Sequence, residues 1–104
     1  MLGLLAFAAA GAAPQPIQLI AEEQGDLTRV LVVGNSAVPL LARYEIEASS
    51  GAGNRSVQSG TVQLRPHQRV VLVSLGMGGR AAGWTAKLKV SYDGGSYELA
   101  KSGS

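Results

Sequence analysis

From Ile17 onward the chain alternates apolar and polar residues in short runs, which clusters of Gly, Ser, Asn and Pro separate. The clearest run is 84–92, where Trp84 and every second residue after it are apolar while Lys87 and Lys89 fall between them. A repeat of two residues is typical of a strand with one buried face and one hydrated face. The pattern predicts seven strands, at about 17–22, 27–34, 40–49, 56–64, 69–75, 84–92 and 96–101.

Finer features of these runs predict how the strands are arranged. The runs at 27–34 and 69–75 are almost continuously apolar, which favours central strands that are covered on both sides. In the run at 56–64 two valines are out of phase, so we expect a β-bulge near Ser59 and Gly60. The turn at 93–95 contains Asp-Gly-Gly, a strong hairpin signal. Seven short strands in about 90 residues favour an all-β, immunoglobulin-like β-sandwich of antiparallel strands, with a small barrel as the alternative.

The 104 residues fit one domain. The first thirteen, MLGLLAFAAAGAA, form an apolar run that is too short to cross a membrane and ends in small residues. This run favours a signal peptide at 1–13 and a single folded domain at 14–104, although it lacks basic residues and an ordinary apolar tail is the alternative. The chain has no cysteine, which excludes thiol redox chemistry, Fe–S clusters and cysteine-based zinc sites.

No set of residues predicts catalysis or metal binding. His67 is the single histidine, and without a second imidazole or a thiolate we interpret it as a hydrated turn residue. Glu45 and Glu47 lie two apart on one strand, where hydrated surface carboxylates are a simpler interpretation than an acid/base pair. Most aromatic residues share the phase of the aliphatic ones, which disfavours a nucleic-acid channel. We therefore expect no enzyme activity, no metal and no cofactor.

The charges are unevenly distributed along the chain. Between residues 27 and 92 there are eight basic residues but two acidic ones. In an immunoglobulin-like sandwich, the strand that carries Arg43 and the strand that carries Lys87 and Lys89 are neighbours, so these three cations would share one outer face. Such a face either keeps the protein soluble or binds an acidic partner.

Three segments resemble those of a known family in order, spacing and turns: IQLIAEEQGDLTRVLVV at 17–33, ARYEIEASSGAGNRSVQSGTVQLRPHQRVVLVSLGM at 42–77, and KLKVSYDGGSYEL at 87–99. In these the chain resembles the curli-assembly inhibitors of Gram-negative bacteria, the CsgC/CsgH family, and its CsgH branch most. The CsgC branch has a Cys-x-Cys pair just before the third strand, where this chain reads Pro39-Leu40-Leu41-Ala42. A redox role suggested for that branch therefore does not apply here.

The resemblance implies a periplasmic, immunoglobulin-like chaperone that keeps the curli major subunit, curlin, from polymerising before secretion. The physical interpretation agrees: a positively charged sheet face would attract an acidic, largely disordered subunit through weak, transient, electrostatic contacts. We expect a monomer that binds neither nucleic acid nor membrane. The expected client-binding residues are Arg43, which has a family counterpart, Lys87, which has an approximate one, and Lys89, which is inferred from phase. Arg29 is a fourth candidate, with the reservation that its strand can lie in the other sheet. A secreted structural or adhesive module of a surface assembly is the alternative function.

Overall fold

The computed structural model describes residues 15–25, 27–51, 53, 55–77 and 83–103. These residues form seven strands and no helix: β1 (Ile17–Gln24), β2 (Leu27–Gly34), β3 (Leu40–Ser50), β4 (Arg55–Leu64), β5 (Val70–Met77), β6 (Trp84–Tyr92) and β7 (Gly95–Gly103). All seven strands predicted from the alternation are present, with bounds that differ by one or two residues at most. The expected signal peptide at 1–13 lies outside the described residues.

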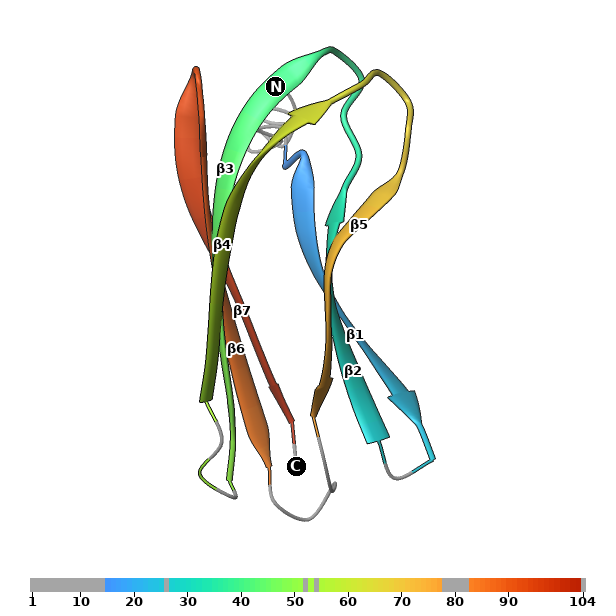
Figure 1. The fold of residues 1–104 in the computed structure, drawn as a ribbon, viewed down its shortest axis with the longest axis vertical. Helices are drawn as coiled ribbons and strands as arrows, with labels where there is room; N and C mark the ends of the chain where they lie inside the picture. Colours follow the sequence, from blue (N-terminus) through green and yellow to red (C-terminus); the bar gives the residue numbers. More distant parts are fainter. Residues whose placement is uncertain (1–14, 26, 52, 54, 78–82, 104) are drawn as a thin grey trace, which may run out of the picture.

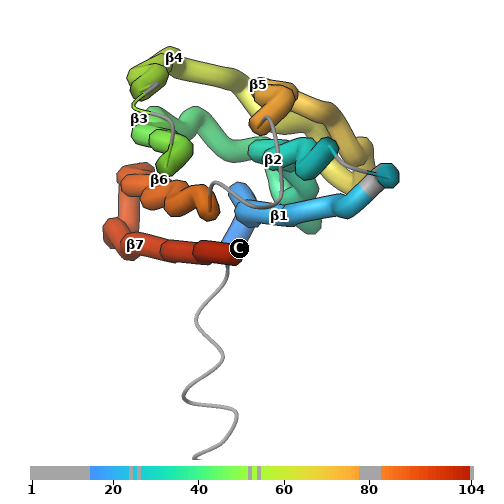
Figure 2. Tube along the Cα trace, turned by 90° about the horizontal axis from the view of Figure 1, so that it is seen from below, coloured from blue at the N-terminus to red at the C-terminus, as the bar shows by residue number. Residues whose placement is uncertain are grey.

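The strands form two antiparallel sheets, a three-stranded sheet in the order β1-β2-β5 and a four-stranded sheet in the order β4-β3-β6-β7. The sheets stack face to face as two layers (Figure 1). This arrangement confirms the immunoglobulin-like β-sandwich and not the small barrel. Seen end-on, β1 and β7 border one side of the sandwich while β4 and β5 border the other (Figure 2).

Alternating side chains of both sheets fill the space between the layers. Along β6, every second residue from Trp84 to Val90 is buried, and the residues between them are exposed. The largest fully buried side chains include Ile17 and Val30 from one sheet and Ile46 and Leu88 from the other. Burial of each such aliphatic side chain contributes roughly 1.5–3 kcal/mol, so the apolar phase of each strand fixes which face turns inward.

The strand β5 differs from the prediction. β2 is central and its residues from Val30 to Gly34 are buried, as expected. β5, which we predicted to be central as well, pairs with β2 alone and is an edge strand. Val70 and Val71 are consequently 39% and 45% exposed. The prediction failed because an apolar run shows that a strand is hydrophobic but does not show whether one or two strands pair with it.

The predicted bulge at Ser59 and Gly60 is also wrong. β4 pairs residue for residue with β3 along its whole length, and Gly60 lies opposite Tyr44. The out-of-phase Val57 is half-exposed on the outer face, which an edge strand tolerates. The irregularity occurs between β2 and β5 instead, at Val32 and Val33, where β5 has one additional residue.

Candidate functional site

The outer face of the four-stranded sheet brings the three predicted cations together. Its central strand β3 is paired with β6, and Arg43 lies opposite Ser91. Two and four residues further along β3, Glu45 and Glu47 lie opposite Lys89 and Lys87. Because residues two apart on a strand share a face, Arg43, Lys87 and Lys89 all point outward from this one sheet. The prediction that they share a face is confirmed.

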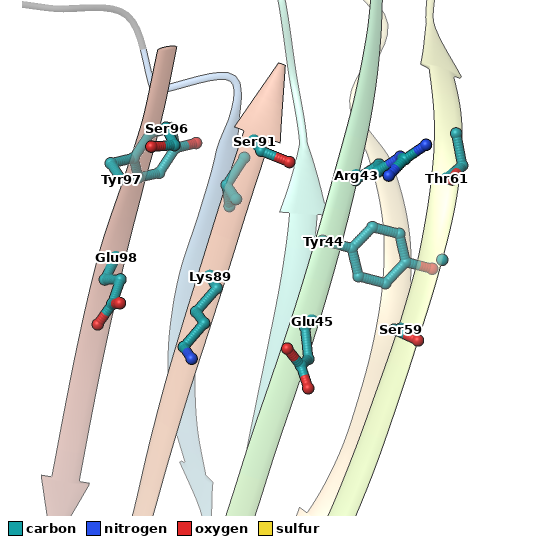
Figure 3. Close-up of a pocket in the computed structure, with 12 residues that line it drawn as sticks. Arg43, Tyr44, Glu45, Ser59, Thr61, Lys89, Ser91, Ser96, Tyr97 and Glu98 are labelled. Carbon is teal, nitrogen blue, oxygen red and sulfur yellow. The ribbon is translucent and has the colours of Figure 1, made fainter.

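Acidic side chains separate these cations. Lys89 lies between Glu45 on β3 and Glu98 on β7. Figure 3 shows the three side chains side by side on neighbouring strands. Opposite charges in directly paired positions attract, so part of the field of Lys89 is compensated within the sheet. The surface is therefore a mosaic of charges and not a purely basic patch.

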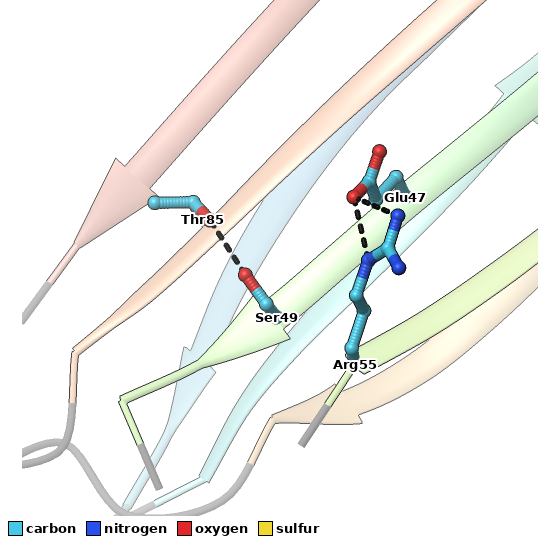
Figure 4. Close-up of polar contacts among 4 residues, drawn as sticks. All are labelled: Glu47, Ser49, Arg55 and Thr85. Carbon is cyan, nitrogen blue, oxygen red and sulfur yellow. Dashed lines mark hydrogen bonds and ion pairs between the residues drawn. The ribbon is translucent and has the colours of Figure 1, made fainter. Parts of the chain in front are cut away.

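At the other end of the face, Glu47 is held by Arg55 of β4. The Nη2 and Nε atoms of Arg55 lie 2.6 and 2.7 Å from Oε2 of Glu47, and both contacts use the same carboxylate oxygen. Figure 4 shows this pair beside the hydrogen bond between the hydroxyls of Ser49 and Thr85. The Arg55 and Glu47 side chains are 63% and 46% exposed, so the ion pair contributes at most about 1 kcal/mol to stability.

Arg43 has different neighbours. Its paired residues are Ser91 on β6 and Thr61 on β4, which carry hydroxyls and no charge. Figure 3 shows the guanidinium extending toward Thr61, at the edge of a groove of about 560 Å³ whose lining also includes Ser59, Lys89 and Glu98. Among the described residues, none forms an ion pair with Arg43. Its charge is thus the one of the three predicted cations without a carboxylate in a directly paired position.

In sum, the face carries four basic residues and three acidic ones, with exposed side chains throughout: Arg43, Arg55, Lys87 and Lys89 against Glu45, Glu47 and Glu98. An open surface with both positive and negative side chains can attract a charged partner and release it readily. Each ion pair with the partner replaces a contact that the side chain already makes with water or with a neighbouring charge. Such an arrangement suits weak recognition.

Arg29 does not belong to this face. It lies on β2, in the other sheet, and its Nη1 donates a 3.1 Å hydrogen bond to the hydroxyl of Ser74 on β5. Its phase on β2 is opposite to that of the core residues Val30 and Val32, so it points out from the opposite side of the sandwich. A partner lying flat on Arg43 cannot contact Arg29 at the same time.

His67 is exposed in the turn between β4 and β5. It has a left-handed backbone conformation (φ 57°), and its N–H donates a 2.7 Å hydrogen bond to the carbonyl of Ser36. Within the part of the chain that the structure describes, no group of three or more His, Cys, Asp or Glu residues is suited to hold a metal ion. No helix in that part is long and apolar enough to span a membrane.

Four charged residues of the face were not among the predicted client-binding residues: Glu45 and Glu47, which we interpreted as hydrated surface carboxylates, and Arg55 and Glu98. Glu98 could have been placed from the hairpin: a two-residue turn at Asp93 and Gly94 pairs Tyr92 with Gly95, which sets Glu98 opposite Lys89. Arg55 follows the Gly-rich turn at the start of β4, and the length of that turn does not fix its register.

No protein-family model matches the chain, and no curated protein matches it in sequence. Among solved structures, the E. coli curli protein CsgC is similar to this chain with a TM-score of 0.63 and 22% identity, over 86% of this chain and 97% of CsgC. The solution structure of R. palustris CsgH is similar with a TM-score of 0.60 and 18% identity, over 81% of this chain and 87% of CsgH. The TM-scores and identities of the two matches are too similar to assign this chain to the CsgC branch or to the CsgH branch. The chain therefore has the fold that these curli proteins share.

Proposed function

We propose that this protein is a chaperone-like inhibitor of amyloid nucleation in curli assembly. In this proposal it acts in the periplasm and keeps the curli major subunit from polymerising before secretion. Two observations support it: the fold that the chain shares with CsgC and CsgH, and the three cations Arg43, Lys87 and Lys89 on one open face. The position of these cations is the observation that carries the proposal, because it gives the fold a surface with which to recognise a client.

The physical mechanism is brief contact with a polypeptide that has not yet assembled. Amyloid begins when segments of low charge and high strand propensity pair and stack, so a partner that meets them early can delay the nucleus without being consumed. Exposed ion pairs contribute about 0.2–1 kcal/mol each, too little to hold a client permanently. The carboxylates beside Lys87 and Lys89 weaken the attraction further, which favours release to the secretion machinery.

The experiment removes charge from the face while it keeps polar, unbranched side chains there. The double variant Lys87→Gln and Lys89→Gln is compared with a control, Arg65→Gln and Lys101→Gln, whose exposed cations lie on the β4–β5 connection and on the edge strand β7. Both variants lose the same net charge. Loss of two exposed contacts, about 0.4–2 kcal/mol in total, lowers affinity for the client by a factor of about 2 to 30.

We expect the face variant to lose most of its delay of subunit polymerisation and the control to keep it. Circular dichroism and thermal unfolding of both variants establish that the fold is intact. Equal inhibition by the two variants would show that Lys87 and Lys89 do not hold the client.

A second candidate is a structural or adhesive module of a secreted surface assembly, which the free edges of β4 and β5 favour. Stoichiometry separates the two functions. An inhibitor of nucleation acts far below one molecule per subunit, whereas a module that joins the assembly is consumed in proportion and is recovered in the fibres.

A further inference from the structure

The edge of β5 is less protected than the other edges of the sandwich. β5 is eight residues long, VVLVSLGM, and has no charged residue and no proline. Native edge strands normally carry charges, prolines or a covering segment, since an uncovered row of backbone N–H and C=O groups recruits further strands. The bulge lies near its beginning, and from Val73 to Met77 the pairing with β2 is regular. Within the part of the chain that the structure describes, this stretch of β5 carries no charge, proline or bulge of its own, and its neighbours across a small hollow at Leu75–Met77 are Arg55 and Ser56 of β4.

The other three edges are each modified. β1 carries Glu22 and Glu23, and β7 carries charged residues and is joined to β1 through the Tyr97 hydroxyl. β4 begins with the charged residue Arg55, whereas β5 has no charged residue along its length. β5 is thus the edge at which an additional strand meets the fewest obstacles.

Cations border this edge. Arg69 directly precedes β5, and Arg29 reaches from β2 across the outer face to the hydroxyl of Ser74 near the middle of β5. Glu22 on β1 lies directly opposite Arg29, so part of the Arg29 charge is compensated from the side away from β5. A strand placed along β5 would therefore meet two guanidinium groups and an uncharged, half-exposed apolar surface that includes Val71.

We infer that the free edge of β5 binds an extended polypeptide segment by strand addition, and that the preferred segment is rich in strand-forming residues and carries carboxylates. The outward backbone groups of β5 pair with the segment, as in other complexes formed by an added strand. Its carboxylates lie near Arg29 and Arg69, where charge complementarity selects acidic over basic segments. One part of this inference rests on the proposed function: that the natural partner is an unassembled amyloid subunit.

The direct test is amide hydrogen exchange by NMR on the full chain with a synthetic peptide. The probe has roughly ten residues, alternating threonine and valine with an aspartate at each end, enough to run along β5. The control peptide has lysine at each end. We expect the aspartate peptide to protect outward-facing amides of Val70–Met77 and the lysine peptide to bind more weakly. Protection confined to β4, changes confined to the face around Arg43, or no change at all would each overturn the inference.

A matched pair of variants tests the edge by charge. Val71→Glu places a carboxylate beside the bound segment, whereas Val38→Glu makes the same change in the β2–β3 loop; the two valines are 45% and 57% exposed. We expect Val71→Glu to abolish binding of the aspartate peptide at concentrations that saturate the parent, and Val38→Glu to preserve it. Equal binding by both folded variants would contradict the inference.

These experiments contain no amyloid subunit, so their failure removes the strand-addition site and leaves the proposed function standing. Conversely, if the chain does not delay subunit polymerisation, the proposed function fails while a positive peptide result remains valid.

Discussion

The hydroxyl of Tyr97 accepts a 2.9 Å hydrogen bond from the N–H of Ile17 and donates a 2.6 Å hydrogen bond to the carbonyl of the same residue. Tyr97 lies on β7 and Ile17 begins β1, so one side chain joins the edges of the two sheets and takes the place of a strand neighbour. The ring of Tyr92 meets that of Tyr97 edge-on, with 6.3 Å between centroids. The hydrogen bonds between Tyr97 and Ile17 close the side of the sandwich that β1 and β7 border. The edges of β4 and β5 on the other side stay open.

Removal of this hydroxyl should destabilise the fold. Tyr97→Phe leaves both partly buried backbone groups of Ile17 without their partner, at a cost of about 1–3 kcal/mol. Urea unfolding measures the loss. The control is Tyr44→Phe, since the structure gives the Tyr44 hydroxyl no hydrogen bond with a described residue; its effect should stay within about 0.5 kcal/mol. Comparable losses in the two variants would argue against the bridge.

The same hydroxyl predicts a loss of stability in alkali. Burial raises the pKa of Tyr97 above its ordinary value of 10.0, the hydrogen bond from Ile17 opposes the rise, and Tyr92 adds to it. A raised pKa in the folded state means that the stabilisation is complete below pH 10 and is lost as pH rises through the folded pKa. Unfolding measured from pH 8 to 11 should show a steeper decline in the parent than in Tyr97→Phe. Parallel curves would contradict the prediction.

Gly34 should not tolerate a methyl group. A Cβ there would lie 2.6 Å from Cδ2 of Leu64, which is 1% exposed and enclosed by the core. We expect Gly34→Ala to destabilise by about 1–3 kcal/mol through overpacking, and the additional change Leu64→Val to recover part of that loss. Gly76→Ala is the control, because its nearest contact would be Leu27 Cδ1 at 3.7 Å. Denaturant unfolding of Gly34→Ala, Leu64→Val, their double variant and Gly76→Ala tests the coupling, which is absent if the effects of the two single changes simply add.

Arg43 should contribute to client binding mainly through its charge. Because its paired neighbours Ser91 and Thr61 carry no charge, its field is less compensated than that of Lys89. We expect Arg43→Gln to reduce inhibition of amyloid formation and Arg43→Lys to retain most of it. Lowering the ionic strength from 0.15 to about 0.01 M lengthens the screening distance from about 8 to about 30 Å and should enlarge the difference. The prediction fails if lysine and glutamine at this position behave alike at both salt concentrations.

The strands could be predicted because each strand's own residues specify them. In β6 the buried and exposed residues alternate without exception up to Ser91, so the sequence and the burial coincide. The inward phase of β3 and β6 likewise placed Arg43, Lys87 and Lys89 on one face. Features that depend on the pairing between strands could not be predicted from the residues of a single strand. β5 is as apolar as a central strand, yet the topology makes it an edge.

The character of the site depends on pairing as well. Glu98 lies beside Lys89 because of the register of the last hairpin, and Arg55 reaches Glu47 because of the register of β3 with β4. Counting charges between residues 27 and 92 omits Glu98 and overstates how basic the face is. The sequence thus predicted the positions of the cations and of the surface carboxylates Glu45 and Glu47, but not Glu98 or the ion pair that Arg55 forms with Glu47.

The central claim, that this chain delays amyloid nucleation by brief contact, is tested most directly by dye-monitored polymerisation of purified curli major subunit. With the chain at roughly a hundredth of the subunit concentration, an inhibitor of the nucleus lengthens the lag phase, whereas a partner that must be consumed has no measurable effect. We predict a lengthened lag. An unchanged lag at this ratio, with a reduction in fibre mass only as the two proteins approach equal concentrations, would contradict the account.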